Sequence, residues 1–282
     1  MSISNVGICG SGIMGSGIAE VAAKSGYNVV LRSRKQETAD ATLAKLEKSL
    51  TRQVERGRLE ADEAATVLGR VTGTADLGAL ADCDLVIESV VENLDIKKAL
   101  FAELDAIVKA DAILATNTST LPIVEMAVAT SRPAQVLGVH FFNPAPAMSL
   151  VEIVSAITTS EETAEVATEF AVSCGKNPVA VKDVAGFIVN ALLFPYLNNA
   201  SRMWENGVAS KEDIDAAMKG GTGHPMGPFA LLDLVGLDTS LSILEALYNE
   251  FRDPNYAPAP TLKRLVSAGR LGRKTGEGFL TY

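Results

Sequence analysis

The sequence predicts an α/β protein, in which an N-terminal doubly wound and mostly parallel sheet precedes an all-helical C-terminal domain. Three observations lead to this fold class. Short β-branched runs alternate with helical stretches in the first half of the chain, and a glycine-rich turn joins the first run to the first helical stretch. Only helical periodicity remains from Gly186 to Ala268. Alternation of this kind is typical of parallel βαβ units with helices on both faces of the sheet.

The elements follow one another in a regular order. At 282 residues the chain is longer than one core usually is, so we expect two domains, residues 1–183 and residues 184–282. In the second domain the helices should break at Gly220-Gly221, at HPMGP and at DPNYAPAP. The expected strands of the first domain are NVGIC, NVVLR, DLVIES, AILAT, VLGVHF, LVEIVSAI and a last one at Pro178 to Lys182, and its expected helices lie near Gly12 to Lys24, Thr38 to Arg56, Asp95 to Val108 and Glu161 to Ser173.

The composition excludes several classes of protein. The net charge of −9 argues against a nucleic-acid partner, because phosphate binding needs an excess of Lys and Arg. No apolar run reaches the roughly 18 residues that cross a bilayer, and the N-terminus carries no basic leader, so we expect a cytoplasmic protein with no membrane partner. Cys9, Cys83 and Cys174 are scattered and form no CxxC motif, so we expect buried thiols and no metal site.

The stretch GSGIMG, Gly10 to Gly15, indicates a dinucleotide site on a Rossmann-type domain. Gly10 permits a tight turn, Gly12 lets the backbone approach a pyrophosphate, and Gly15 allows a helix to pack closely on the strand. The helix N-terminus then offers N–H groups and a partial positive charge to the anion. We therefore assign the turn, with Ile13 and Met14, to cofactor binding.

The second strand departs from the pattern of an NAD site. An Asp or Glu about 20 residues past the glycines usually accepts hydrogen bonds from the ribose hydroxyls. Here Ser33 stands at that place, between Arg32 and Arg34, with Lys35 next along the chain. A 2′-phosphate would be attracted by these cations. We predict a preference for NADP(H), with NAD(H) also possible; the alternative is an exposed basic turn that binds NAD less tightly.

Polar side chains follow three successive strands. Ligands in doubly wound sheets bind at the carboxyl ends of the strands, so these side chains should converge on one crevice. A lone histidine at a strand end is as often a core residue, but its polar neighbours here favour a functional one. The polar residues are Glu88, Glu92 and Lys97 after the first of these strands, Asn117 and Ser119 after the second, and His140 and Asn143 after the third.

Seven segments together carry a resemblance to a known family. The chain resembles the short-chain (S)-3-hydroxyacyl-CoA dehydrogenases, and among them the bacterial 3-hydroxybutyryl-CoA dehydrogenases. The match extends over nearly the whole chain, in order and spacing. The segments are GSGIMGSGIA, ESVVENLDIK, NTSTLPI, HFFNPAPAMSLVEIV, GFIVNALLFPYLNNA, GTGHPMGPFALLDLVGLD and GRKTGEGF.

The resemblance implies an oxidoreductase that interconverts acetoacetyl-CoA and (S)-3-hydroxybutyryl-CoA by hydride transfer. It implies His140 and Glu152 as the acid/base pair, with Ser119 and Asn190 placing the substrate oxygen. It also implies a homodimer that associates through the C-terminal domain. Besides the glycine turn and the residues near Ser33, we assign Glu92, Lys97, Asn117, Ser119 and Asn143 to the cofactor.

Chemistry supports the catalytic assignment independently. Oxidation of a secondary alcohol requires removal of the hydroxyl proton as the hydride leaves, and an imidazole can accept this proton. A carboxylate holds the imidazole tautomer and stabilises the imidazolium. Hydrogen bonds from Ser119 and Asn190 would stabilise an alkoxide-like oxygen. The alternative for Asn190 is a polar residue at an interdomain contact.

A second basic cluster lies in KLEKSLTRQVERGR. Lys45, Lys48, Ser49, Arg52 and Arg56 share one helix face by their spacing, which is ordinarily a solvated surface. The resemblance implies that Ser49 and Arg56 contact coenzyme A, and we include Arg52 with them. It places Lys274 near the acyl-CoA, too. Ser149, where the family often has Lys, and Leu280, where an aromatic residue is common, depart from the pattern and put substrate detail in doubt.

Two rival functions remain at this point. The substrate could be a related free 3-hydroxy acid such as L-gulonate, which would have no need of the basic helix. The chain could also be a nucleotide-binding regulatory protein without turnover, which the presence of His140, Glu152, Ser119 and Asn190 together disfavours.

Overall fold

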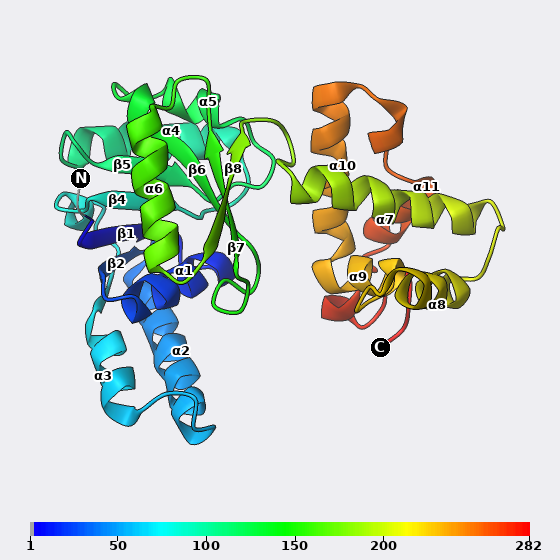
Figure 1. Ribbon diagram of the computed structural model, residues 1–282, viewed down its shortest axis with the longest axis horizontal. Helices are drawn as coiled ribbons and strands as arrows, with labels where there is room; N and C mark the ends of the chain where they lie inside the picture. Colours follow the sequence, from blue (N-terminus) through cyan, green and yellow to red (C-terminus); the bar gives the residue numbers. More distant parts are fainter. Residues whose placement is uncertain (1–2) are drawn as a thin grey trace. The chain divides into compact units, whose positions relative to one another are not determined.

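The computed structural model describes residues 3–282, which divide into two compact units, one ending at Asp183 and the other beginning at Val184. The first unit is built on a sheet of eight strands within the described residues, in the order β3-β2-β1-β4-β5-β6-β7-β8 (Figure 1). The strands are β1 (Asn5–Cys9), β2 (Asn28–Arg32), β3 (Val71–Thr74), β4 (Leu85–Glu88), β5 (Ile113–Thr116), β6 (Val136–Phe141), β7 (Leu150–Ser155) and β8 (Asn177–Lys182).

The sheet is mostly parallel, as the sequence predicts. Strand β1 pairs in parallel with β2 on one side and β4 on the other, so the strand order reverses at the carboxyl end of β1. This is the place where open α/β sheets bind ligands. One pair departs from the parallel pattern: β6 and β7 run antiparallel. Residues 142–149 between them contain no helix, and a parallel connection would need a crossover of a dozen residues or more.

Helices cover both faces of the sheet. Side chains of α1, α2, α3 and α6 share one apolar cluster with the strands. Val139 of β6 belongs to this cluster, whereas the neighbouring Gly138 faces Ile123 of α5 on the opposite side. Figure 1 shows α6 in front of the strands and α4 behind them. The helices are α1 (Ile13–Lys24), α2 (Gln36–Glu55), α3 (Ala61–Gly69), α4 (Leu94–Ile107), α5 (Ile123–Ala127) and α6 (Glu161–Ser173).

The second unit is helical. Its core includes Phe194, Phe229 and Leu244, and the Trp204 ring packs edge-on against Phe229. The buried Asp233 carboxylate accepts hydrogen bonds from the backbone N–H groups of Phe279 and Leu280, which ties the C-terminal segment to this core. The helices are α7 (Val189–Glu205), α8 (Lys211–Thr222), α9 (Pro228–Val235), α10 (Leu237–Phe251) and α11 (Pro260–Ser267).

Two local predictions need correction. Helix α8 runs through Gly220-Gly221 to Thr222 and ends at Gly223, whose φ is 70°, so the expected break at the two glycines is wrong. Each glycine costs a helix about 1 kcal/mol relative to alanine, which does not by itself end it. Helix α3 and strand β3 are not among the predicted elements; the strand VTGT has four residues, too few to show a clear alternation.

The three cysteines are buried thiols. Burial raises the pKa of Cys9 and of Cys83 to about 12, so neither is a reactive thiolate. Among the described residues, no cluster of His, Cys, Asp and Glu could hold a metal ion. Over the same residues, no helix combines the length and the apolar character that a membrane span needs.

Candidate active site

The glycine turn after β1 is fixed by close backbone approach. Gly10 has a φ of 121°, and a Cβ there would collide with the carbonyl of Ser89, while a Cβ on Gly15 would collide with the carbonyl of Gly10. Gly12, by contrast, has no heavy atom within 4 Å of its Cβ position. Two glycines therefore pack the turn against the protein, and the middle one leaves its outer side open.

The N-terminus of α1 is suited to an anion. The helix begins at Ile13, Gly12 gives it no side-chain cap, and its first turn contains no acidic residue. Its first N–H groups and the helix dipole therefore favour a negatively charged ligand. Ile13 is 77% exposed, whereas Met14 is half-buried and packs against the core.

A cavity of about 1020 Å³ opens beside this turn. Its walls come from the glycine turn, the end of β2, the loop after β4 and one side of α4. The size and the uncapped helix end fit a dinucleotide. The lining includes Gly12, Ser33, Arg34, Lys35 and Val90.

At the end of β2, Ser33 is buried and its hydroxyl accepts a hydrogen bond from Ser11 at 2.9 Å. The guanidinium of the half-buried Arg32 donates to the carbonyl of Ala75 at 3.4 Å. Arg34 and Lys35 are exposed and line the same cavity. This part of the cavity therefore carries cations where an NAD site usually has a carboxylate.

His140 and Glu152 lie directly opposite each other on β6 and β7. His140 Nδ1 and Glu152 Oε2 are 2.7 Å apart, and the residues are only 6% and 1% exposed. The antiparallel register thus brings together two residues twelve positions apart in the chain. The ring of Phe142 lies 4.5 Å from that of His140, centroid to centroid. A carboxylate in this position holds the imidazole in one orientation.

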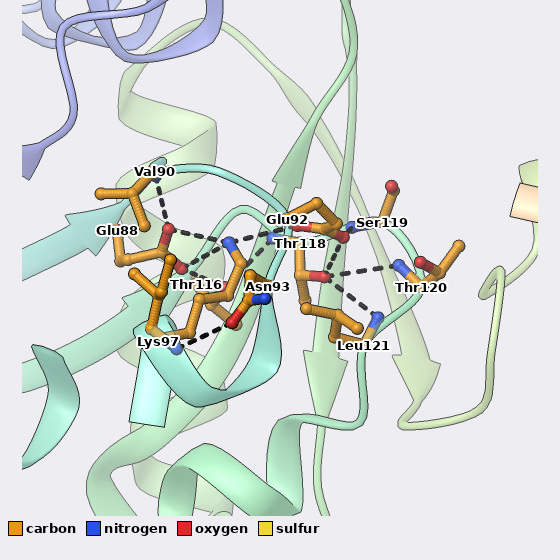
Figure 2. A network of polar contacts seen from close by, with 11 residues as sticks. Glu88, Val90, Glu92, Asn93, Lys97, Thr116, Thr118, Ser119, Thr120 and Leu121 are labelled. Atoms are coloured by element: carbon orange, nitrogen blue, oxygen red, sulfur yellow. Dashed lines mark hydrogen bonds and ion pairs between the residues drawn. The ribbon is translucent and has the colours of Figure 1, made fainter. Parts of the chain in front are cut away.

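Glu92, from the loop after β4, holds the turn after β5. Its Oε1 accepts hydrogen bonds from Thr118 Oγ1 at 2.5 Å and from the backbone N–H of Ser119 at 3.1 Å. Figure 2 shows the Ser119 side chain directed away from this carboxylate. The Asn117 side chain accepts from the backbone N–H of Phe141 at 2.8 Å, which joins the ends of β5 and β6 next to His140.

Lys97 is enclosed rather than offered to the cavity. It is 1% exposed, and its ammonium lies 2.8 Å from each oxygen of Glu88 and 3.2 Å from Glu92. The structure therefore joins Glu88, Glu92, Lys97 and Ser119 in one polar network at the ends of β4 and β5 (Figure 2).

The loop after β6 carries Asn143, which is exposed and precedes Pro144 through a cis peptide bond. Lys176 supports this loop, because its buried ammonium donates to the carbonyls of Ala145 at 2.7 Å and Met148 at 2.8 Å. Burial lowers the pKa of Lys176. Sequence reasoning missed Lys176 and Thr118, since neither stands in a motif that signals the hydrogen bonds it makes.

The basic face of α2 lines a shallow hollow of about 360 Å³. The buried Glu20 of α1 binds two side chains of this face. Its carboxylate accepts hydrogen bonds from Gln53 at 2.9 Å and from Ser49 at 3.4 Å. Lys24 completes this contact at 2.7 Å from Glu20. The residues around the hollow are Lys45, Lys48, Ser49, Arg52, Gln53 and Arg56.

The second unit carries the remaining predicted residues. Asn190 is buried in the first turn of α7. Lys274 is exposed and pairs with Asp238, with both carboxylate oxygens 2.6 Å from its ammonium. His224, the second histidine of the chain, is exposed and lies edge-on to Tyr196 with the ring centroids 5.7 Å apart.

Comparison with known families covers both units. The sequence model for the NAD binding domain of 3-hydroxyacyl-CoA dehydrogenase matches residues 5–184, and the model for the C-terminal domain of 3-hydroxyacyl-CoA dehydrogenase matches residues 186–282. A probable 3-hydroxybutyryl-CoA dehydrogenase from Deinococcus radiodurans is 50% identical over 98% of this chain and 99% of its own.

Two solved structures are similar along the whole chain. FadB2 from Mycobacterium tuberculosis is 48% identical, with a TM-score of 0.98 and 100% of both chains covered. The (S)-3-hydroxybutyryl-CoA dehydrogenase PaaH1 from Ralstonia eutropha is 42% identical, with a TM-score of 0.97, and the match covers 100% of this chain and 99% of that one.

Proposed function

Because the chain belongs to the 3-hydroxyacyl-CoA dehydrogenase family, we propose that it interconverts acetoacetyl-CoA and (S)-3-hydroxybutyryl-CoA by hydride transfer with a nicotinamide cofactor. The observation that carries this proposal is the buried pair of His140 and Glu152, 2.7 Å apart. The pair lies at the edge of the sheet where the glycine turn after β1 also opens. The full-length similarity to 3-hydroxybutyryl-CoA dehydrogenases supports the four-carbon substrate.

His140 is the group that moves the proton. In the oxidative direction its imidazole accepts the proton of the 3-hydroxyl, and in the reductive direction the imidazolium returns it. Glu152 binds Nδ1, so the exchange takes place at the other ring nitrogen, and the carboxylate stabilises the imidazolium. The nicotinamide, when bound, supplies or accepts the hydride at the carbon that carries this oxygen.

Ser119 and Asn190 bind the substrate oxygen in this proposal. Negative charge develops on that oxygen in the transition state, and hydrogen-bond donors fixed beforehand stabilise it. Support for Ser119 comes from its position: Glu92 holds its backbone N–H, while its side chain turns away from Glu92 (Figure 2). Asn190 is proposed from its place in the family motif GFIVNALLF.

For the cofactor we propose NADP(H) in preference to NAD(H). The support is the group of cations at the end of β2, where Ser33 replaces a carboxylate and Arg34 and Lys35 line the cavity. The uncapped N-terminus of α1, with Gly12 open beside it, fits the pyrophosphate of either cofactor. We also assign Glu92, Asn117, Ser119 and Asn143 to this site, and Lys97 to its frame.

The basic face of α2 is proposed to bind the phosphates of coenzyme A, with Ser49, Arg52 and Arg56 as contacts. The six cationic or polar side chains around this hollow suit a ligand that carries phosphates. The alternative substrate, a free 3-hydroxy acid, carries no phosphate and would not need them. Lys274 is proposed to lie near the acyl-CoA, where its pairing with Asp238 holds its side chain.

We further propose a cytoplasmic homodimer that associates through the helical unit. Exposed apolar side chains on that unit include Leu192, Val208 and Leu234. Light scattering after gel filtration measures the oligomeric state directly, and a monomer at micromolar concentration would contradict the proposed dimer.

A steady-state matrix tests the function as a whole. The enzyme is assayed for oxidation of NADPH and of NADH with acetoacetyl-CoA and with a longer 3-ketoacyl-CoA. We expect turnover with acetoacetyl-CoA and the higher kcat/KM with NADPH. A lack of turnover with both 3-ketoacyl-CoA compounds would contradict the proposed function, and a clear NADH preference would contradict the cofactor assignment alone.

A further inference from the structure

We propose that Glu88 is a positioning residue for the reaction: its buried carboxylate fixes Lys97 and, through Lys97 and Glu92, the turn that carries Ser119. The proposal rests on the proposed function, because it assigns Ser119 to the substrate oxygen. It concerns a group that makes no contact with substrate and acts through others.

Glu88 is the last residue of β4 and is 0% exposed. Its Oε1 accepts hydrogen bonds from the backbone N–H of Val90 at 2.5 Å and from Lys97 at 2.8 Å. Its Oε2 accepts from Lys97 at 2.8 Å and from Thr116 Oγ1 at 2.7 Å. A carboxylate this deeply buried is stable only with such a complete set of donors.

The contacts continue from Glu88 to Ser119 without a gap. Lys97 Nζ lies 3.2 Å from Glu92 Oε2, and the other oxygen of Glu92 accepts from Thr118 Oγ1 and from the backbone N–H of Ser119. Figure 2 shows this sequence of contacts leading from the end of β4 to the turn after β5.

The charges explain why Glu88 matters for the position of Glu92. One ammonium is shared by two carboxylates, of which Glu88 is fully enclosed and the Glu92 side chain is 39% exposed. The enclosed pair holds Lys97 in place, and Lys97 in turn holds a side chain that could otherwise turn to solvent. Replacing Glu88 by Gln leaves the buried ammonium facing an amide, so Lys97 must move toward Glu92 or water.

The same carboxylate also holds the loop after β4. Its Oε1 accepts a hydrogen bond from the backbone N–H of Val90, and Val90 lines the cavity assigned to the cofactor. Loss of the charge should therefore loosen both the loop after β4, which lines the cofactor cavity, and the turn after β5, which carries Ser119. The strand core needs no such ion pair, because Val86 and Ile87 are buried among apolar side chains.

The test compares Glu88→Gln with a matched control, Asp84→Asn. Asp84 precedes β4 at the opposite end of the strand, is also buried, and pairs with Lys109. Both variants lose one buried charge of an ion pair. We expect Glu88→Gln to lower kcat about tenfold or more with a smaller change in KM, and Asp84→Asn to leave kcat within about twofold of wild type.

A double variant separates positioning from general damage. If Glu88 acts through Ser119, then Glu88→Gln together with Ser119→Ala loses little more kcat than Ser119→Ala alone. Thr116→Val, a nearly isosteric change that removes one donor to Glu88, should show a smaller loss of the same kind and serves if Glu88→Gln does not fold. Fully additive losses in kcat, or equal kcat for Glu88→Gln and Asp84→Asn, would overturn the proposal.

Amide hydrogen exchange provides a readout without turnover. The segment from Asn117 to Leu121 should exchange faster in Glu88→Gln than in wild type, and at the wild-type rate in Asp84→Asn. Unchanged exchange there in Glu88→Gln would refute the positioning role even if acetoacetyl-CoA proved not to be the substrate. A wild-type enzyme that lacks turnover but shows the expected exchange would instead place the fault with the proposed function.

Discussion

At the scale of single residues, several side chains in and around the candidate site are buried polar or charged groups, each held by a specific partner. His140 has Glu152, Lys97 has Glu88 and Glu92, and Lys176 has two backbone carbonyls. Burial makes each of these arrangements rigid, because loss of the partner would leave a charge or dipole uncompensated. Rigid placement is what general acid/base chemistry and oxyanion stabilisation require.

Ser33 decides the choice of cofactor in this account. Ser33→Asp places an anion where the 2′-phosphate of NADP would lie, so we expect kcat/KM with NADPH to fall roughly tenfold or more, while that with NADH is maintained or rises. Steady-state kinetics with both cofactors measures the effect. Ser33→Ala is the matched control, since it removes the hydroxyl without adding charge and should keep the NADPH preference. A wild type that prefers NADH, or an unaltered preference in Ser33→Asp, would contradict the assignment.

At the scale of elements, the sequence predicts the strands of the central sheet well because β-branched runs are a strong local signal. Strands β1, β2 and β6 have the predicted bounds. Two features could not be predicted from local signals: α8 passes through two glycines, and α3 and β3 are short, with 9 and 4 residues. The resemblance and its chemistry predicted that His140 pairs with Glu152. They did not predict the geometric cause of this pairing, which is the antiparallel register of β6 and β7.

The proposed contact between the basic face of α2 and coenzyme A is tested most sharply at Arg56, which follows the last residue of the helix. Arg56→Glu should raise KM for acetoacetyl-CoA about tenfold at low salt, with little effect on KM for a truncated thioester that lacks the nucleotide. Arg58→Glu is the matched control, because Arg58 is exposed nearby but does not line the hollow. If both thioesters, or both variants, respond equally, α2 does not contact coenzyme A.

At the scale of the whole molecule, stability at low pH depends in part on the ionised carboxylate of Asp84, which lies at the amino-terminal end of β4. Burial alone would raise the pKa of Asp84, but hydrogen bonds from Lys109 and from the backbone N–H groups of Asn5 and Ser4 outweigh it and lower the pKa. A lowered carboxylate pKa means that the unfolded chain binds the proton more readily. Its stabilisation is therefore present above about pH 4, the unfolded value, and is lost as the pH falls through the folded pKa.

We therefore expect the urea midpoint of wild type to fall more steeply than that of Asp84→Asn as the pH decreases below about 4. At neutral pH the variant should be the less stable of the two. Glu47→Gln, which removes an exposed carboxylate, controls for the change in net charge and should follow wild type. Parallel curves for wild type and Asp84→Asn would show that the Asp84 pair does not contribute in this way.

The chain divides at Asp183 and Val184 into two compact units. The features that could be predicted from the sequence differ in physical kind from those that could not. Motifs that require a backbone geometry, such as the glycine turn, could be read from the sequence, since only glycine fits at Gly10 and Gly15. Networks that join distant segments could not, because the contact of Glu88 with Thr116 or of Lys176 with Ala145 depends on which strand ends are neighbours. The sequence thus indicates which residues are reactive more readily than which residues hold them.

The central claim, that His140 moves the proton, is tested most directly by kcat for acetoacetyl-CoA reduction in His140→Gln. We expect a loss of about a thousandfold, with the cofactor still bound at nearly the wild-type Kd by fluorescence titration. His224→Gln, which changes the exposed second histidine, should keep wild-type kcat. A His140→Gln enzyme that reduces acetoacetyl-CoA at a rate near that of wild type would contradict the account.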